Sequence, residues 1–93
     1  MTKRTKAISG RQWVKLRQCL GLSQLQIGIV RRLFCGKSRQ EIARELAISP
    51  DMVRTQIDDV YRDFGVSNRV QLVLHLLTTL REHWTHRGKD LSV

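Results

Sequence analysis

The sequence predicts an all-α fold, a small bundle of four or five helices that contains a helix-turn-helix. Three observations support this prediction. Apolar residues recur at three- and four-residue steps, and no strand-like alternation is visible. Serines stand where several helices would begin. Two short helical segments are joined by the tight stretch at residues 46–50, and 93 residues are enough for one small core.

The first expected helix runs from Ser9 to Leu20. Trp13, Leu16 and Leu20 share one side of it because they are three and four residues apart. Gly21 would end this helix, since glycine tolerates the left-handed conformation found at many helix ends.

The second expected helix begins at Ser23. The serine hydroxyl can accept a hydrogen bond from the first turn, and Gln26 can reach back to the serine backbone. Gly36 would stop the helix. Ile27 and Phe34 lie away from its inward face, and we expect them to pack on the first helix, with a partner protein as the alternative. That inward face consists of Leu25, Ile29, Val30 and Leu33.

The third and fourth helices would form the helix-turn-helix. Ser38 opens the third helix, and Glu41 completes a second capping box. The buried side of this helix consists of Ile42, Ala43 and Leu46. Ser49 then caps the fourth helix, and Pro50 suits the first helical position because its missing amide donor has no partner there.

The fourth helix has one clear inward stripe, and Gly65 would end the helix. The stripe consists of Val53, Ile57, Val60, Tyr61 and Phe64. The opposite side therefore displays Asp51, Thr55, Asp58, Asp59 and Arg62, flanked by Arg54 and Gln56. We expect Asp59 and Asp63 to be rim charges or partners of Arg62.

The last expected helix starts at Asn68, supported by Gln71, and runs to about Trp84. It carries more apolar residues than one side can bury, and the surplus requires a second apolar partner. We predict a homodimer interface formed by Leu74, Leu77 and Trp84, with packing beneath the first helix as the alternative. The first eight residues and the tail after Trp84 are expected to be loose.

The charge is strongly basic but unevenly distributed. The formal net charge is +9, and residues 1–21 contribute six basic and no acidic side chains. Residues 49–66, which include the fourth helix, carry two basic and four acidic side chains. A basic chain favours polyanionic partners, although acidic proteins and membranes also attract such chains.

Several functional classes find no support in the sequence. No apolar run is long enough to cross a membrane or to form a signal peptide, so we expect a cytoplasmic protein. Cys19 and Cys35 match no zinc spacing and are expected as reduced thiols in or near the core. His83 and His86 lack further ligands, and the histidines are expected to be exposed. We therefore expect no metal, no cofactor and no enzymatic activity.

Residues 22–73 carry a recognisable series of motifs. Leu22-Ser23 is followed by Gly-Lys-Ser-Arg-Gln-Glu-Ile-Ala at 36–43, by the turn at 46–49, and by Gly-Val-Ser-Asn-Arg at 65–69. This run resembles the LuxR/GerE-type DNA-binding domain of bacterial transcription regulators, without gaps and over 52 of 93 residues. Other helix-turn-helix families share the Glu-Ile-Ala segment, but sigma-factor region 4, the nearest of them, lacks the Gly-Val-x-Asn-Arg ending.

The resemblance implies that the fourth helix enters the major groove of duplex DNA. The residues placed at base edges are Arg54, Thr55, Asp58 and Asp51. The residues placed along the DNA backbone are Lys37, Ser38, Arg39, Gln40, Ser49, Gln56, Arg62 and Arg69. It also implies that the last helix pairs with its two-fold mate, which would give an inverted-repeat site with half-sites about one turn apart.

The chain departs from the family at informative positions. Met52, Arg54 and Gln56 stand where the family usually has threonine, lysine and histidine, and Leu25-Gln26 stands for Arg-Glu. Asp58 and Asp63 replace residues that are commonly basic or polar. An arginine can form a bidentate pair with guanine, whereas an aspartate either accepts from the cytosine amino group or is repelled by phosphate.

The predicted function is sequence-specific DNA binding by a stand-alone helix-turn-helix transcription regulator, with another regulatory protein or RNA polymerase as further partners. The alternative is a protein-binding module that keeps the fold and has lost DNA binding. The expected organisation is a basic arm and short extra helix at 1–21, the LuxR/GerE-like domain at 22–86 and a flexible tail at 87–93. The basic N-terminal segment is expected to follow DNA phosphates or to enter the minor groove, with a solubilising tail as the alternative.

Overall fold

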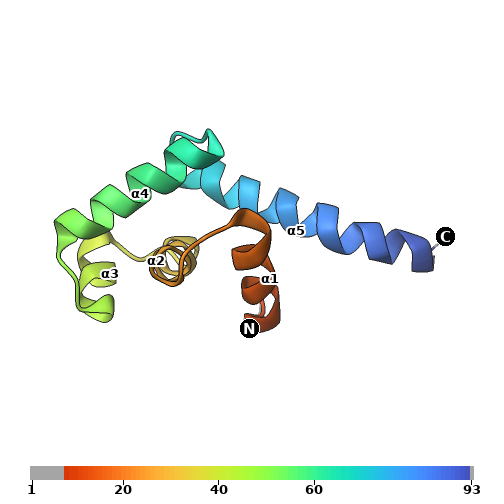
Figure 1. Ribbon diagram of the computed structural model, residues 1–93, viewed down its shortest axis with the longest axis horizontal. Helices are drawn as coiled ribbons and strands as arrows, with labels where there is room; N and C mark the ends of the chain where they lie inside the picture. Colours follow the sequence, from red (N-terminus) through yellow and green to blue (C-terminus); the bar gives the residue numbers. More distant parts are fainter. Residues whose placement is uncertain (1–7, 93) are drawn as a thin grey trace.

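The computed structural model describes the backbone of residues 8–92 and the side chains of residues 8–82. This part of the chain consists of five α-helices and contains no strand, which confirms the all-α prediction. The helices are α1 (Gly10–Leu20), α2 (Gln24–Phe34), α3 (Arg39–Leu46), α4 (Pro50–Phe64) and α5 (Arg69–Ser92) (Figure 1). The loose segment predicted for the first eight residues falls, except for Ile8, outside the described residues.

Serine caps begin the first four helices, at Ser9, Ser23, Ser38 and Ser49. The capping boxes predicted at Ser23 and Ser38 are both present, and a third one joins Ser9 to Gln12. Each cap satisfies a backbone N–H that the helix itself leaves without an acceptor, and such a cap contributes about 1 kcal/mol. The local sequence therefore fixes where each of these helices begins.

Three of the first four helices end at or just before a glycine, as predicted. Gly21 and Gly65 end α1 and α4 at φ values of 66° and 69°, and Gly36 follows α2 at 88°. The turn between α3 and α4 uses Ala47 at φ 58°, a conformation that costs an L-residue about 1–2 kcal/mol. The Ile48 N–H donates to the Ala43 carbonyl at 3.0 Å and helps to close this turn.

One core joins all five helices. It includes residues from α1 through α5, with Leu22 contributed by the α1–α2 connection. The Trp13 and Phe34 rings meet edge to face with 5.5 Å between their centroids, and Ile27 is also buried. These contacts confirm that the extra N-terminal helix packs within the chain. Val53, Ile57 and Val60 of α4 are buried as predicted.

Three side-chain predictions need correction. Tyr61 and Phe64 pack against the core as the inward stripe predicts, but they are only half-buried. His75 is half-buried and stacks on Phe64 at 4.7 Å, so the expectation of an exposed histidine is wrong for this residue. Cys19 and Cys35 are exposed free thiols, because α1 and α2 present these positions to solvent near their ends.

The end of the last helix was also predicted wrongly. α5 continues to Ser92 instead of ending near Trp84, and it extends away from the bundle (Figure 1). Residues 85–92 contain no proline, and the helix continues through Gly88 although glycine is a poor helix former. The side chains of Trp84, His83 and His86 lie outside the described residues. The division of the chain into an arm, a domain and a tail stays a prediction.

Candidate nucleic-acid interface

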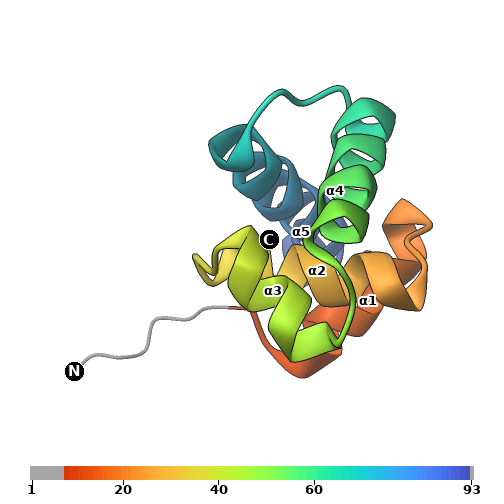
Figure 2. The same cartoon turned by 90° about the vertical axis from the view of Figure 1, so that its left-hand side faces the viewer.

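The helix-turn-helix consists of α3, the turn at Ala47–Ser49 and α4. Figure 2 shows α3, this turn and the start of α4 together on the near side of the molecule. Ile42, Ala43 and Val53 are buried in the core and fix the two helices against each other. As a result, the first turns of α3 and α4 lie beside each other, and a groove between them is lined by Arg39, Gln40, Pro50, Asp51 and Arg54.

The outer face of α4 is exposed along most of the helix. The predicted base-contact residues Asp51, Arg54, Thr55 and Asp58 are all exposed. Arg54 pairs with Asp51 at 3.5 Å, and Arg62 pairs with Asp59. In each pair the arginine lies about one helical turn after its aspartate. The prediction that Asp59 pairs with Arg62 is confirmed, whereas the pair at Arg54 was missed although its i,i+3 spacing was visible in the sequence. Exposed pairs of this kind contribute about 0–1 kcal/mol, so they exchange readily for other partners.

The start of α3 is held by its own capping box. The Ser38 hydroxyl accepts from the Glu41 N–H at 3.1 Å, and the Glu41 carboxylate accepts from the Ser38 N–H at 2.8 Å. The hydrogen bond from the Ser38 N–H lowers the pKa of Glu41 below its ordinary value of 4.5. The Ser38 hydroxyl therefore caps α3. Ser38 is nevertheless exposed to solvent, as are its neighbours Arg39 and Gln40.

An ion-pair cluster links α2 and α3 beside this helix start. The Glu45 carboxylate accepts from the Lys37 ammonium at 2.6 Å and from the Arg32 guanidinium at 2.8 Å. The hydrogen bond from Lys37, followed by that from Arg32, lowers the pKa of Glu45, and the same contact raises the pKa of Lys37. Sequence reasoning missed Glu45, because no spacing rule relates residues 13 positions apart on different helices. The contact with Glu45 fixes the position of the Lys37 ammonium, and the carboxylate compensates part of its positive charge.

Arg69 ties the start of α5 to the segment before α3. Its guanidinium donates to the Lys37 carbonyl at 2.7 Å, across 32 residues of sequence. The predicted backbone-contact residues Lys37, Arg39 and Arg69 are therefore brought together by the fold. Asn68 caps α5 by accepting from the Gln71 N–H at 2.9 Å, and the Gln71 side chain reaches back to the Ser67 N–H.

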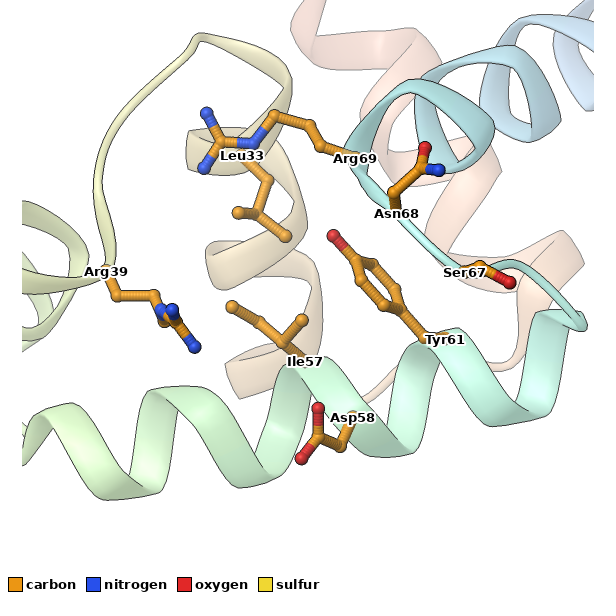
Figure 3. A pocket seen from close by; sticks show the side chains of 8 residues that line it. All are labelled: Leu33, Arg39, Ile57, Asp58, Tyr61, Ser67, Asn68 and Arg69. Atoms are coloured by element: carbon orange, nitrogen blue, oxygen red, sulfur yellow. The ribbon is translucent and has the colours of Figure 1, made fainter.

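A second groove runs between α4 and the starts of α3 and α5, with a volume of about 330 Å³. Arg39 and Arg69 approach this groove from opposite sides, and the Tyr61 ring projects into it from α4 (Figure 3). Asp58 lies on the α4 side of the same groove. Burial raises the pKa of the Tyr61 hydroxyl above its ordinary value of 10.0. Tyr61 was assigned to the inward stripe, and the polar tip of a tyrosine was the available sign of a second role.

The remaining predicted site residues lie apart from these two grooves. Ser49 accepts from the Met52 N–H at 3.0 Å, and the Gln56 amide points toward the Met52 sulfur at 3.8 Å. Leu74 and Leu77 on α5 are 56% and 44% exposed, so they do not pack beneath α1. Val70, four residues before Leu74, is 67% exposed and extends the same apolar face.

No described helix has the length and apolar character needed to cross a membrane.

Comparison with known proteins assigns the helix-turn-helix to a family. The family model described as "Bacterial regulatory proteins, luxR family" matches residues 20–76, which is more than half of the chain. The chain belongs to this family. This confirms the resemblance drawn from residues 22–73, and α1 precedes the matched segment almost entirely. The luxR family consists of bacterial regulatory proteins, and residues 20–76 of this chain form the segment that the family model describes.

Named relatives cover the same segment. A probable transcriptional regulatory protein NarL of Mycobacterium tuberculosis is 36% identical over 52 residues, which is 56% of this chain and 24% of that protein. A putative HTH-type transcriptional regulator Mb0914c of Mycobacterium bovis is 38% identical over 52 residues, which is 56% of this chain and 6% of that protein. The LuxR-family chain thus spans a quarter or less of these relatives. No solved structure matches it significantly.

Proposed function

We propose that this protein binds duplex DNA sequence-specifically, with α4 in the major groove and the start of α3 on the adjoining backbone. The observation that carries the proposal is that both elements are exposed to solvent on one side of the molecule. The outer face of α4 and the first turn of α3 are solvent-exposed on the same side of the molecule (Figure 2). An α-helix fits into the major groove of B-DNA, and protein groups beside that helix can then contact the phosphates on either side of the groove.

Base recognition rests on the exposed residues of α4. Arg54 leaves Asp51 and donates to the N7 and O6 acceptors of guanine, an exchange that a weak surface pair permits. Thr55 contacts a base edge or a thymine methyl group, and Asp58 accepts from a cytosine amino group. Asp51, freed from Arg54, lies at the edge of the same surface.

Backbone contacts come from both ends of the interface. Lys37, Ser38, Arg39, Gln40 and Arg69 lie at the starts of α3 and α5, and Ser49, Gln56 and Arg62 lie on or next to α4. The first turn of a helix attracts phosphate because its free N–H groups carry partial positive charge. These contacts set the register of α4 in the groove, whereas the base contacts select the sequence.

Dimerisation through α5 completes the proposal. Leu74 and Leu77 are exposed and three residues apart, so they share one side of the helix with Val70. Exposed apolar surface favours burial by roughly 25 cal/mol per Å². A two-fold pair of α5 helices, with Trp84 placed further along the same helix, buries this face and presents two α4 helices to an inverted repeat.

Selection of bound duplexes from random DNA tests the proposed function. We expect a consensus with two inverted half-sites about one helical turn apart. Leu74→Glu places a charge on the dimer face and should convert the protein to a monomer that binds one half-site weakly. Recovery of no consensus from the selection, combined with the absence of binding at micromolar protein, would reject the proposal.

A second candidate function is a protein-binding module that has kept the fold without binding DNA. The acidic character of α4 favours it, because Asp58 and Asp63 remain exposed after two arginines have paired with Asp51 and Asp59. Arg54→Ala separates the two functions. DNA affinity that is unchanged by this substitution, together with loss of a copurifying protein, supports the module instead.

A further inference from the structure

We propose that the groove between α4 and the starts of α3 and α5 is the seat of one DNA phosphodiester, and that the Tyr61 hydroxyl is its central hydrogen-bond donor. This inference rests on the proposed function and adds a contact that the pattern of the sequence had assigned to the core. It makes Tyr61 a binding residue with a dual role, in which the ring packs and the hydroxyl holds phosphate.

The position of Tyr61 along α4 supports this assignment. Arg54, Asp58 and Tyr61 are spaced by four and three residues, so they follow one line along the helix. Arg54 lines the groove at the start of α4, and Asp58 and Tyr61 line the next one. A line of side chains that begins at the base edges near Arg54 leaves the major groove further along the helix, where a strand of the DNA backbone lies.

The groove has the chemistry of a phosphodiester site. Arg39 and Arg69 bring two positive charges from opposite sides, and the Tyr61 ring stands between α4 and the start of α5 with its hydroxyl directed away from α4 (Figure 3). Arg69 is held in place by its 2.7 Å hydrogen bond to the Lys37 carbonyl, so its charge is positioned before DNA arrives. Hydrogen bonds to a charged phosphate oxygen are stronger than those between neutral groups.

The Tyr61 hydroxyl is available for such a contact. Among the residues whose side chains are described, no hydrogen bond joins this hydroxyl to another protein group, although the side chain is half-buried. A half-buried polar group without a protein partner is satisfied by water or by a ligand. A phenol with an ordinary pKa of 10.0 is protonated at neutral pH, and burial raises the pKa of Tyr61 further, so the group acts as a donor toward an anion.

Asp58 decides where in the groove the phosphate lies. Its carboxylate lies beside α4, whereas the Tyr61 hydroxyl points away from that helix (Figure 3). Like charges repel, so an anion avoids this side and settles toward Tyr61 and Arg69.

Methylphosphonate scanning with Tyr61→Phe tests the proposal. The duplex selected with the full chain is prepared as a series in which one phosphate at a time is replaced by an uncharged methylphosphonate. Affinities of wild type and Tyr61→Phe are measured across the series by fluorescence anisotropy. Tyr61→Phe keeps the ring, and urea unfolding checks that its stability is unchanged.

The expected result is a position-specific coupling. Tyr61→Phe should weaken binding to the unmodified duplex about tenfold, as expected for a hydrogen bond to a charged acceptor. One phosphate in each half-site, when neutralised, should weaken the wild type more than it weakens Tyr61→Phe, since the variant has already lost the hydroxyl contact and keeps only those of the arginines. Because the hydroxyl is neutral, the dependence of affinity on salt should not change.

Two matched charge variants complete the experiment. Arg39→Gln should couple to the same phosphate, whereas Arg44→Gln, which removes an equal charge from the last turn of α3, should show no coupling to it. Wild-type affinity for Tyr61→Phe, or an equal loss at every methylphosphonate position, would overturn the phosphate seat while leaving the proposed function intact. A free anion in the groove would likewise give no position-specific coupling. Failure of the wild type to bind any duplex would reject both.

Discussion

The start of α3 and the outer face of α4 are neighbours in space, yet they hold their charges in opposite ways. At the start of α3, Lys37 and Arg69 are fixed by contacts to Glu45 and to the backbone, so positive charge is part of the fold. On α4, the two arginines are paired with aspartates of the same helix, and these pairs are exposed. The first region therefore holds its positive charges in fixed positions, whereas the exposed pairs of the second region can exchange partners.

This difference explains how an acidic helix can belong to a DNA-binding family. Attraction to the duplex is a long-range property of the whole chain, which carries +9. Sequence selection is a short-range property of a few side chains on α4. Under the proposed function, local carboxylates therefore reduce unspecific affinity for DNA while they leave the specific contacts available.

The largest expected effect comes from removing the exchangeable arginine. Arg54→Ala should weaken binding to the selected duplex by about 1–3 kcal/mol and relax the preference at one base position in each half-site. Anisotropy titrations with the selected duplex and single-base variants measure both effects. Arg44→Ala is the control, because it removes an arginine outside the interface. Equal losses in the two variants would contradict a base contact for Arg54.

The second prediction concerns Asp58, whose negative charge on α4 should repel DNA phosphates. Asp58→Asn should strengthen binding to mixed-sequence DNA by about 1 kcal/mol or less, because repulsion between charges a few ångströms apart in water has that size. The same variant should lose part of its preference for the selected sequence. Asp63→Asn removes an equal charge further along α4 and should change affinity less. A fall in affinity for mixed-sequence DNA with Asp58→Asn would argue against this role.

The turn that joins the two regions carries a measurable strain. Ala47 has a φ of 58°, and Ala47→Gly should stabilise the fold by roughly 0.5–1 kcal/mol, since glycine adopts this conformation freely but loses more chain entropy. Urea unfolding measures the change. Ala43→Gly, in the buried interior of α3, should instead destabilise by about 1 kcal/mol. Destabilisation by Ala47→Gly would show that the turn differs from the one described.

The smallest expected effect is a pH dependence at the anchor. The folded-state pKa values of Glu41 and Glu45 are lowered from 4.5, so their contribution is present above that pH and is lost as the pH falls through the folded values. The pKa of Lys37 is raised from 10.5, so its contribution is lost only as the pH rises through the folded value. Urea midpoints should therefore fall below about pH 4.5, and less steeply in Glu45→Gln. An identical pH profile in that variant would contradict the ion-pair cluster.

The elements that local rules govern were predictable from sequence. The caps at Ser23, Ser38 and Ser49 and the glycine ends depend on a few neighbouring residues, and the structure confirms them. The contacts that place the anchor were not predictable. Glu45 meets Lys37 and Arg32 only after α2 and α3 have packed, and no periodicity encodes such a meeting.

Tyr61 and α5 illustrate two further limits. A helical stripe assigns Tyr61 to the core, but it does not say that the end of a long side chain emerges into a groove. The last apolar residue of the expected stripe is Trp84, yet α5 continues to Ser92, because a helix can continue without an apolar stripe. The family resemblance located the predicted interface, but it could not show which charges are already paired.

The most direct measurement is the affinity of the full chain for a mixed-sequence duplex at several salt concentrations. If attraction to phosphate outweighs the carboxylates of α4, binding should occur at micromolar protein. The logarithm of the association constant should then fall linearly with the logarithm of salt concentration, with a slope of about −0.9 for each phosphate contacted. Absent binding, or binding that does not change with salt, would contradict this account of the protein.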